Sequence, residues 1–254
     1  MTTAKYKNPP LNEVVMGVKF RPIEGLHSQH GGLFWSKIKS DFPFSEQAPN
    51  LDIPFKSIKE LYPAPRFWFI SQDKNQLIQL QNNIFYFNWR KVEGVGVYPD
   101  YDSVKAQFNK YFPQFKEYLK ANSFKEPEII ECQFSYINHV FQDKGWERIE
   151  DIMKIVQSIS FPQTLKHGGG IHGIDMNFSY NLPDEEKGKH FIKIKNAAVR
   201  STDEKIFIIE NVAKGVDPYA ASLDEWFDYA HKHLVNTFES LMDDNIQKTI
   251  WGKK

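Results

Sequence analysis

The 254-residue sequence contains a single cysteine, Cys132. One thiol excludes an intrachain disulfide and a cysteine-rich zinc site. The sequence also lacks a signal-peptide-like apolar run at its start, and it has no apolar stretch near the roughly 18 residues that indicate a membrane-spanning helix. We therefore expect a cytoplasmic protein with no membrane partner.

Neither sign of charge predominates, because Lys plus Arg and Asp plus Glu number 32 each. Proteins that depend on phosphate contacts normally carry a basic excess. Nucleic acid is therefore a less expected partner than protein, and a local basic patch remains the alternative.

Several patterns of catalytic and cofactor sites are missing as well. The chain has no Walker loop, no Gly-x-Gly-x-x-Gly, no His-Glu-x-x-His and no Gly-x-Ser-x-Gly elbow. His27 and His30 lie near two glycines, but without a nearby carboxylate pattern they are a weak metal signal. We expect no cofactor and no bound metal, and the sequence favours a non-enzymatic protein.

Aromatic residues, by contrast, make up 15 % of the chain, which fits a thick core or a stacking surface. The most regular pattern runs from Ser222 to Met242, where apolar residues recur three and four positions apart. This spacing predicts an amphipathic helix that covers another element. Ser222 and Glu225 stand at capping-box spacing, which predicts a capped start.

A similar helix is predicted after Pro99, with a kink or break at Pro113. Its apolar positions precede matching positions of the C-terminal helix by 123 residues: Val104, Tyr111, Phe112, Phe115, Tyr118 and Leu119 correspond to Phe227, Leu234, Val235, Phe238, Leu241 and Met242. Ile84-Phe85 precedes Ile206-Phe207 by 122 residues. These offsets indicate an internal repeat.

The other elements repeat in the same order. Strands are predicted at residues 11–20, 66–71, 76–81 and 84–90, and again at 128–140, 171–182, 189–199 and 205–212. Short helices are predicted at 31–41 and 146–159, and an irregular connection at 42–65. Each half then reads strand, helix, three strands, long helix.

The predicted fold class is accordingly α+β, a tandem duplication with a tail at 1–10 and halves at 11–122 and 123–254. Strands joined by short turns pair antiparallel, and each long helix covers one face of a curved sheet. The outline resembles the saddle of TATA-box-binding-protein-like folds, with the helix-grip fold as the alternative. Fold-level likeness implies no function.

Basic and aromatic residues alternate on the strand faces predicted to point away from the helices. Such an open face can hold a partner's acidic segment or a nucleic-acid strand, although an ordinary solvated face is the simpler interpretation. The candidate binding surface consists of Arg66, Tyr86, Arg90, Lys91, Phe191, Lys193 and Lys195.

A pocket between sheet and helices is the competing site. His231 lies on the apolar stripe of the last helix, and His139 lies near the end of a strand. Glu13 and Glu131 take matching places on the first strand of each half. A histidine beside a carboxylate can serve as a base or ligand-binding group, whereas the simpler interpretation is a histidine at the edge of the core.

Five short motifs, spread in order along nearly the whole chain, carry a family resemblance: Pro9-Pro10-Leu11-Asn12-Glu13-Val14-Val15, Arg66-Phe67-Trp68-Phe69-Ile70-Ser71, Phe87-Asn88-Trp89-Arg90-Lys91, Tyr136-Ile137-Asn138-His139 and Ile250-Trp251-Gly252. With them the chain resembles a sporadically distributed bacterial family of proteins of about this length, which carries no established activity. The resemblance implies no catalytic residues, and its patchy distribution suits mobile or defence-related genes.

The leading hypothesis is a non-enzymatic binding module whose open sheet face holds a protein partner or a second copy, encoded in a bacterial defence or toxin–antitoxin-like locus. A small-molecule-binding protein or enzyme that uses the pocket is the first alternative. Single-stranded nucleic-acid binding by the sheet face is the second.

Overall fold

The computed structural model describes residues 6–49, 65–95, 98–157, 159, 170–217 and 222–254. Over these residues the protein is α+β, with an antiparallel sheet and five α-helices, as predicted. The chain divides into two compact units. The insert unit is Glu13–Gln133, and the terminal unit combines Met1–Asn12 with Phe134–Lys254.

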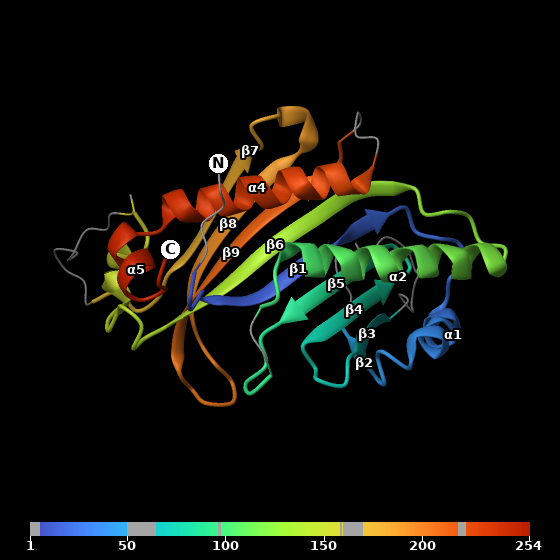
Figure 1. Ribbon diagram of the computed structural model, residues 1–254, viewed down its shortest axis with the longest axis horizontal. Helices are drawn as coiled ribbons and strands as arrows, with labels where there is room; N and C mark the ends of the chain where they lie inside the picture. Colours follow the sequence, from blue (N-terminus) through green and yellow to red (C-terminus); the bar gives the residue numbers. More distant parts are fainter. Residues whose placement is uncertain (1–5, 50–64, 96–97, 158, 160–169, 218–221) are drawn as a thin grey trace. The chain divides into compact units, whose positions relative to one another are not determined.

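The insert unit follows the predicted order closely. Its elements are β1 (Leu11–Phe20, which begins in the terminal unit), α1 (Ser28–Ile38), β2 (Phe44–Ala48), β3 (Arg66–Ile70), β4 (Gln76–Gln81), β5 (Ile84–Arg90) and α2 (Tyr101–Ala121). Neighbouring strands run in the order β2-β3-β4-β5-β1, and α2 lies along this part of the sheet (Figure 1).

Three details of the insert unit differ from expectation. The connection predicted to be irregular contains β2, whose five residues pair with β3. The sequence pattern did not predict this strand because its side chains are mostly exposed and do not alternate between apolar and polar. Helix α2 continues through Pro113 without a break. Helix α1 begins at Ser28, three residues before the predicted start.

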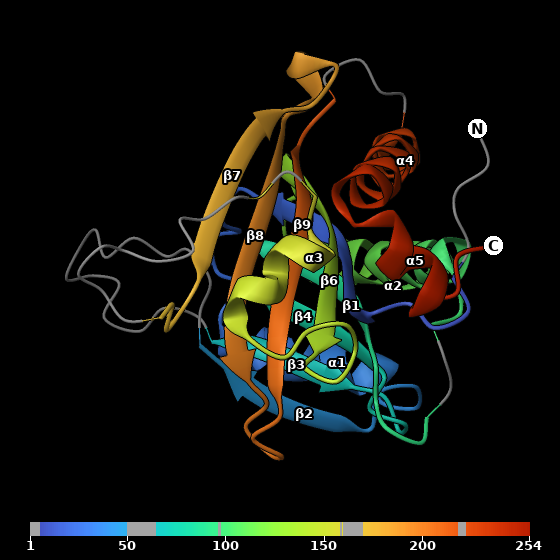
Figure 2. The same cartoon turned by 90° about the vertical axis from the view of Figure 1, so that its left-hand side faces the viewer.

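The terminal unit has its own meander. After β6 (Ile129–Phe141, which begins in the insert unit) come a 3-10 turn (Ile149–Asp151), α3 (Ile152–Ile155), β7 (Asp175–Asn181), a second 3-10 turn (Glu185–Lys187), β8 (Lys189–Ala198), β9 (Lys205–Gly215), α4 (Leu223–Leu241) and α5 (Asp244–Thr249). Its strands neighbour one another in the order β6-β9-β8-β7. Figure 2 shows α4 and α5 on one side of β8 and β9.

Two predictions for the terminal unit are wrong in detail. The helix expected at 146–159 is reduced to the 3-10 turn and the four residues of α3, because Val156 instead forms a β-bridge with Met242. The capping box of α4 is absent: Ser222 is the N-cap residue, but its side chain makes no capping hydrogen bond.

The core of the terminal unit lies between the sheet and its helices. Strands β8 and β9 contribute Ile192, Ile194, Phe207 and Ile209, all buried. Because side chains alternate along a strand, Phe191, Lys193 and Lys195 lie on the opposite face of β8. The terminal unit therefore has one face under α4 and α5 and one face turned away from them.

The N-terminal segment pairs with the C-terminal residues of the terminal unit. Lys7 and Asn8 donate backbone hydrogen bonds to the carbonyls of Gly252 (3.1 Å) and Trp251 (2.9 Å), and Tyr6 forms an antiparallel bridge with Lys253. Part of the segment predicted to be a tail is thus paired.

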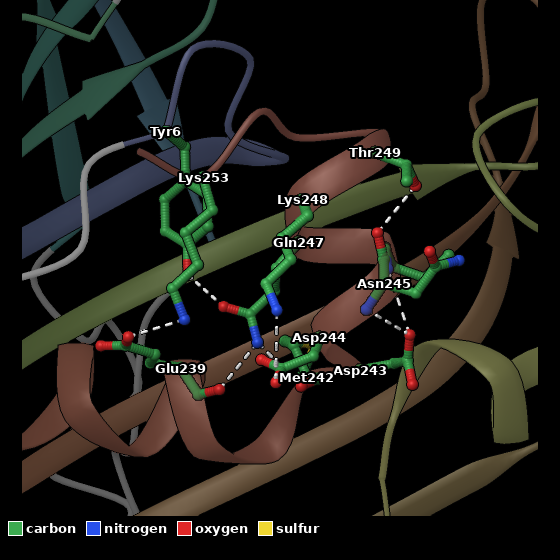
Figure 3. Close-up of polar contacts among 11 residues, drawn as sticks. Tyr6, Glu239, Met242, Asp243, Asp244, Asn245, Gln247, Lys248, Thr249 and Lys253 are labelled. Atoms are coloured by element: carbon green, nitrogen blue, oxygen red, sulfur yellow. Dashed lines mark hydrogen bonds and ion pairs between the residues drawn. The ribbon is translucent and has the colours of Figure 1, made fainter.

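The Gln247 side chain forms hydrogen bonds with three residues where the N-terminal segment meets the C-terminal helices (Figure 3). Its fully buried amide donates to the carbonyls of Glu239 and Met242, each at 2.8 Å, and accepts from the Tyr6 hydroxyl at 2.7 Å. Burial, followed by the charges of Glu239 and Asp244, raises the pKa of Tyr6 to about 12. The hydroxyl therefore stays a hydrogen-bond donor.

Replacing Tyr6 with phenylalanine should lower the free energy of unfolding by about 1–2 kcal/mol, because the buried Gln247 oxygen loses its donor. Urea denaturation measures the change. Tyr180→Phe is the matched control: Tyr180 is 52 % exposed, so the same change there should leave stability within about 0.5 kcal/mol. Equal effects at both positions would contradict a stabilising role for the Tyr6 hydroxyl.

Two glycines allow a close backbone approach where β8 begins and β9 ends. A Cβ on Gly188 (φ 125°) would lie 2.1 Å from the Lys214 carbonyl oxygen, and one on Gly215 would lie 2.1 Å from that of Lys187. Backbone atoms cannot yield as a flexible side chain can, so the close approach requires glycine at both positions.

Gly188→Ala should therefore destabilise the protein by about 2–3 kcal/mol through backbone strain and the clash. Gly32→Ala is the control within α1, where an added Cβ meets no described atom within 4 Å. That change should stabilise by about 0.5–1 kcal/mol. Thermal unfolding of both variants tests the pair, and a neutral Gly188 variant would show that the backbone there can relax.

Candidate functional site

The predicted binding-surface residues of the insert unit lie away from α2. Phe85 packs on Phe112 of α2, with ring centroids 5.3 Å apart, so the alternating Tyr86 belongs to the opposite face of β5. Tyr86 is nevertheless buried. Arg90 donates its Nε–H to the Lys74 carbonyl at 2.8 Å, and Lys91 follows the strand as an exposed residue.

A row of side-chain hydrogen bonds crosses four strands on this face. The Arg66 guanidinium donates to Gln79 Oε1 (2.9 Å), Gln79 Nε2 donates to Asn88 Oδ1 (2.9 Å), and Asn88 Nδ2 donates to Glu13 Oε1 (2.5 Å). A guanidinium can only donate and a carboxylate accepts, so both amide orientations are fixed. Gln79 and Asn88 are buried, and burial lowers the pKa of Arg66.

This row brings together two residues assigned to different candidate sites, Arg66 of the surface and Glu13 of the pocket. Both buried amides are engaged inside the sheet. Buried polar side chains that are paired across neighbouring strands contribute to fold specificity. Its arrangement serves to hold β3, β4, β5 and β1 in register.

Phe191, Lys193 and Lys195 of the terminal unit share the β8 face turned away from α4, as predicted from alternation. Acidic groups stand beside both lysines: Lys195 Nζ lies 3.7 Å from Glu210 and Lys193 Nζ lies 3.8 Å from Asp175. Phe191 is opposite Val212 of β9 in the register. The face is thus charge-compensated around an aromatic and aliphatic pair.

The two pocket histidines lie on opposite faces of β6. His231 of α4 shares a 2.8 Å hydrogen bond between its Nδ1 and the Tyr136 hydroxyl. His139 alternates with the buried Val140 and so belongs to the other face; its backbone N–H donates to the Pro10 carbonyl at 2.8 Å. The structure does not bring these histidines together.

Glu13 and Glu131, the predicted carboxylate partners, both belong to the insert unit. Glu131 precedes the buried Cys132. Burial, and to a smaller extent the charge of Glu131, raises the pKa of Cys132 to about 12. A thiol with so high a pKa is a poor nucleophile near neutral pH.

Two further histidines, on β8 and α4, were not among the predicted site residues but lie side by side. His233 Nε2 lies 3.1 Å from His190 Nδ1, and the other ring nitrogen of His190, Nε2, is hydrogen-bonded to Asn211 Oδ1. Asn211 Nδ2 donates to the Leu234 carbonyl at 2.9 Å. His190 and Asn211 are buried, and His233 is half-buried. We call this arrangement the histidine chain.

The direction of every hydrogen bond in the histidine chain follows from its buried end. The Leu234 carbonyl only accepts, so Asn211 turns its amide N–H₂ toward it and its oxygen toward His190. His190 therefore carries its proton on Nε2, and its Nδ1 accepts from the Nε2–H of His233. In neutral His233 the remaining nitrogen, Nδ1, is a hydrogen-bond acceptor.

Burial keeps both rings neutral at ordinary pH. It lowers the pKa of His190 to about 4, against a smaller opposing effect of the Asn211 hydrogen bond, and the nearby His233 lowers it further. Burial also lowers the pKa of His233. A proton added to His190 would fall on Nδ1 and break its bond to His233, whereas His233 can take one on Nδ1 without losing any bond of the chain.

Exposed aromatic side chains lie beside the histidine chain. Tyr180 of β7 is opposite His190 in the register, with ring centroids 6.1 Å apart. Phe178, two residues earlier, is opposite Ile192 and shares its face. Tyr180 is 52 % and Phe178 38 % exposed, which is unusual for ring side chains on the helix side of a sheet.

Within the described ranges, no three His, Cys, Asp or Glu side chains are grouped to hold a metal ion. No described helix is long and apolar enough to cross a membrane. No family model, curated protein or solved structure matches the chain.

Proposed function

We propose that the protein is a non-enzymatic binding module that holds a protein partner on the terminal-unit face containing Phe191, Lys193 and Lys195. The observation that carries the proposal is the pairing of both lysines with acidic residues of the same face. Such a face presents both signs of charge around apolar side chains, which suits a protein surface better than a row of phosphates.

The aromatic residue at the centre of this face supplies its specificity. Phe191 is only partly buried and stands across from Val212. Aromatic side chains surrounded by polar groups are the usual anchors of protein interfaces.

The placement of the protein in a bacterial defence or toxin–antitoxin-like locus rests on the family resemblance alone and belongs to the same proposal.

Affinity capture from a bacterial host, with the purified protein as bait, tests the proposal. The wild type and Leu33→Asp should retain similar amounts of a specific host protein. Phe191→Asp should retain at least tenfold less of it. Leu33 is a control because it is 52 % exposed on α1 of the other unit. Equal capture by all three baits would show that this face is not the binding surface. Turnover of a metabolite by the protein alone would contradict the hypothesis that it is non-enzymatic.

Binding of single-stranded nucleic acid by the same face is the weaker alternative, because its lysines are already partnered. We expect a 20-nucleotide oligonucleotide to bind no tighter than the about 10⁻⁴–10⁻⁶ M of non-specific contacts at physiological salt. Fluorescence anisotropy at several salt concentrations measures this. Tight binding with a steep salt dependence would favour the nucleic-acid function instead.

We also propose that the chain arose by tandem duplication. The support is that each unit contains a three-stranded antiparallel meander whose last strand neighbours the strand that begins the repeat: β5 lies beside β1, and β9 beside β6. In each unit a long helix, α2 or α4, follows that meander. The resemblance to TATA-box-binding-protein-like or helix-grip folds remains part of this proposal.

A further inference from the structure

We propose that the outer edge of β7 is a dimerisation surface, where β7 pairs antiparallel with β7 of a second copy of this chain around Phe178. A contact between strand edges covers neither face of β8. The dimer therefore goes beyond the binding function proposed above, because it leaves the face with Phe191, Lys193 and Lys195 uncovered.

Strand β7 lies at the margin of the terminal-unit sheet (Figure 2). It pairs with β8 on one side and, among the described residues, with no strand on the other. Natural edge strands are usually protected from pairing by lysine, proline or a bulge. The sequence of β7, DMNFSYN, contains neither lysine nor proline, and its seven residues pair with β8 without interruption. This edge therefore remains able to pair with another strand.

The backbone groups at the outer edge of β7 belong to every second residue. In an antiparallel ladder, each residue turns its N–H and C=O groups to the same side, and successive residues alternate between the two sides. On the β8 side, the Ile174 carbonyl accepts from Asn196 (3.2 Å) and Leu182 donates to Gly188 (3.0 Å). The residues at odd-numbered positions therefore point their N–H and C=O groups outward: Asp175, Asn177, Ser179 and Asn181.

A second β7 satisfies these groups when the two-fold axis passes through Phe178. Asn177 then exchanges two backbone hydrogen bonds with Ser179 of the second copy, and Asp175 exchanges two with Asn181. Phe178 stands opposite its own copy as a pair without backbone hydrogen bonds, in which the Cα atoms are only about 4.5 Å apart. This register pairs all seven residues of β7.

The side chains fit the same register. Phe178 and Tyr180 are 38 % and 52 % exposed, and they would meet Phe178 and Met176 of the second copy, which gives both exposed rings cross-strand partners. Asp175, the one charged residue of β7, stands opposite the neutral Asn181, so no like charges face each other. The strand is thus complementary to itself, which favours a second copy over an unrelated strand. Because both copies use the same edge, the contact closes as a dimer.

Sedimentation velocity over a range of protein concentrations tests the dimer. A contact this small falls at the weak end of protein interfaces, so we expect the dimer to form at about 10–100 µM protein. Ser179→Pro removes an outward N–H without removing a bond to β8, and it should weaken the dimer at least about tenfold. Ser179→Thr is the matched control, because it keeps the N–H and should leave the dimer intact. Thermal unfolding checks that both variants remain folded.

Cross-linking through an introduced cysteine tests the register. Phe178→Cys places two thiols within the Cα separation that a disulfide needs, about 4.4–6.8 Å, and oxidised glutathione should convert this variant to a covalent dimer. In Asp175→Cys the two thiols would lie on strands whose matching Cα atoms are roughly 20 Å apart, so cross-linking should be at least tenfold slower. The native Cys132 is buried and serves as the background in the wild type.

Two results would overturn the proposal. The first is a wild type that remains monomeric at about 500 µM, well above the expected dissociation constant. The second is cross-linking of Phe178→Cys and Asp175→Cys at equal rates, which would show random collision instead of a fixed register. Because the cysteine variants leave the Ser179 N–H in place, the second test stands even if Ser179→Pro folds poorly.

Discussion

Replacing Phe85 with alanine is expected to lower the free energy of unfolding by about 3–5 kcal/mol, the usual cost of removing a buried phenyl ring. Phe85 is fully buried on β5. Its ring lies 5.3 to 6.4 Å, centroid to centroid, from four other phenylalanine rings: Phe34, Phe108, Phe112 and Phe115. These rings come from two helices, so few neighbours can move to fill the cavity.

Phe44→Ala in the same unit is the matched control. Phe44 is 41 % exposed on β2, so the identical substitution should cost less than about 1 kcal/mol. Guanidinium denaturation followed by tryptophan fluorescence measures both variants. Similar losses at the two positions would mean that the aromatic cluster around Phe85 contributes little to stability.

Acid should destabilise the terminal unit through His190. The pKa of this buried residue is lowered from 6.5 to about 4 in the folded protein. Between these values the unfolded chain binds a proton that the folded chain excludes. Stability is therefore complete above pH 6.5 and falls as the pH approaches 4, by up to about 3 kcal/mol from this group.

Urea denaturation at pH 7 and at pH 4.5 isolates the contribution of His190. In His190→Gln the loss between the two pH values should be smaller by about 2 kcal/mol or more, whatever the absolute stability of the variant. His27→Gln, the same substitution at an exposed histidine, is the matched control variant. If His190→Gln keeps the full pH dependence, another group is responsible.

The regular elements could be predicted from the sequence because their patterns are local. The boundaries of β1, β4 and β5 agree with those expected from alternation, and α4 lies within a residue of its expected ends. The pattern failed where tertiary contacts decide the conformation. Val156 looks like one more residue of an amphipathic helix, but its pairing with Met242 makes it a bridge residue.

The polar clusters could not be predicted because their members are distant in sequence. Hydrogen bonds connect residues 43 apart in the pair His190–His233 and 75 apart in Asn88–Glu13. Alternation does place His190 on the same face as Ile192 and Ile194, and this was the one available signal. A histidine at a core position of a strand implies a buried partner but does not say which one.

The contact between Tyr6–Asn8 and Trp251–Lys253 has a consequence for how the protein is made. The terminal unit joins segments from both sides of the insert unit, so its packing is incomplete until the ribosome has released the region around Trp251. The insert unit is contiguous from Glu13 to Gln133 and can acquire its native contacts while synthesis of the later strands continues. Nascent chains should accordingly reach protease resistance first in the insert unit.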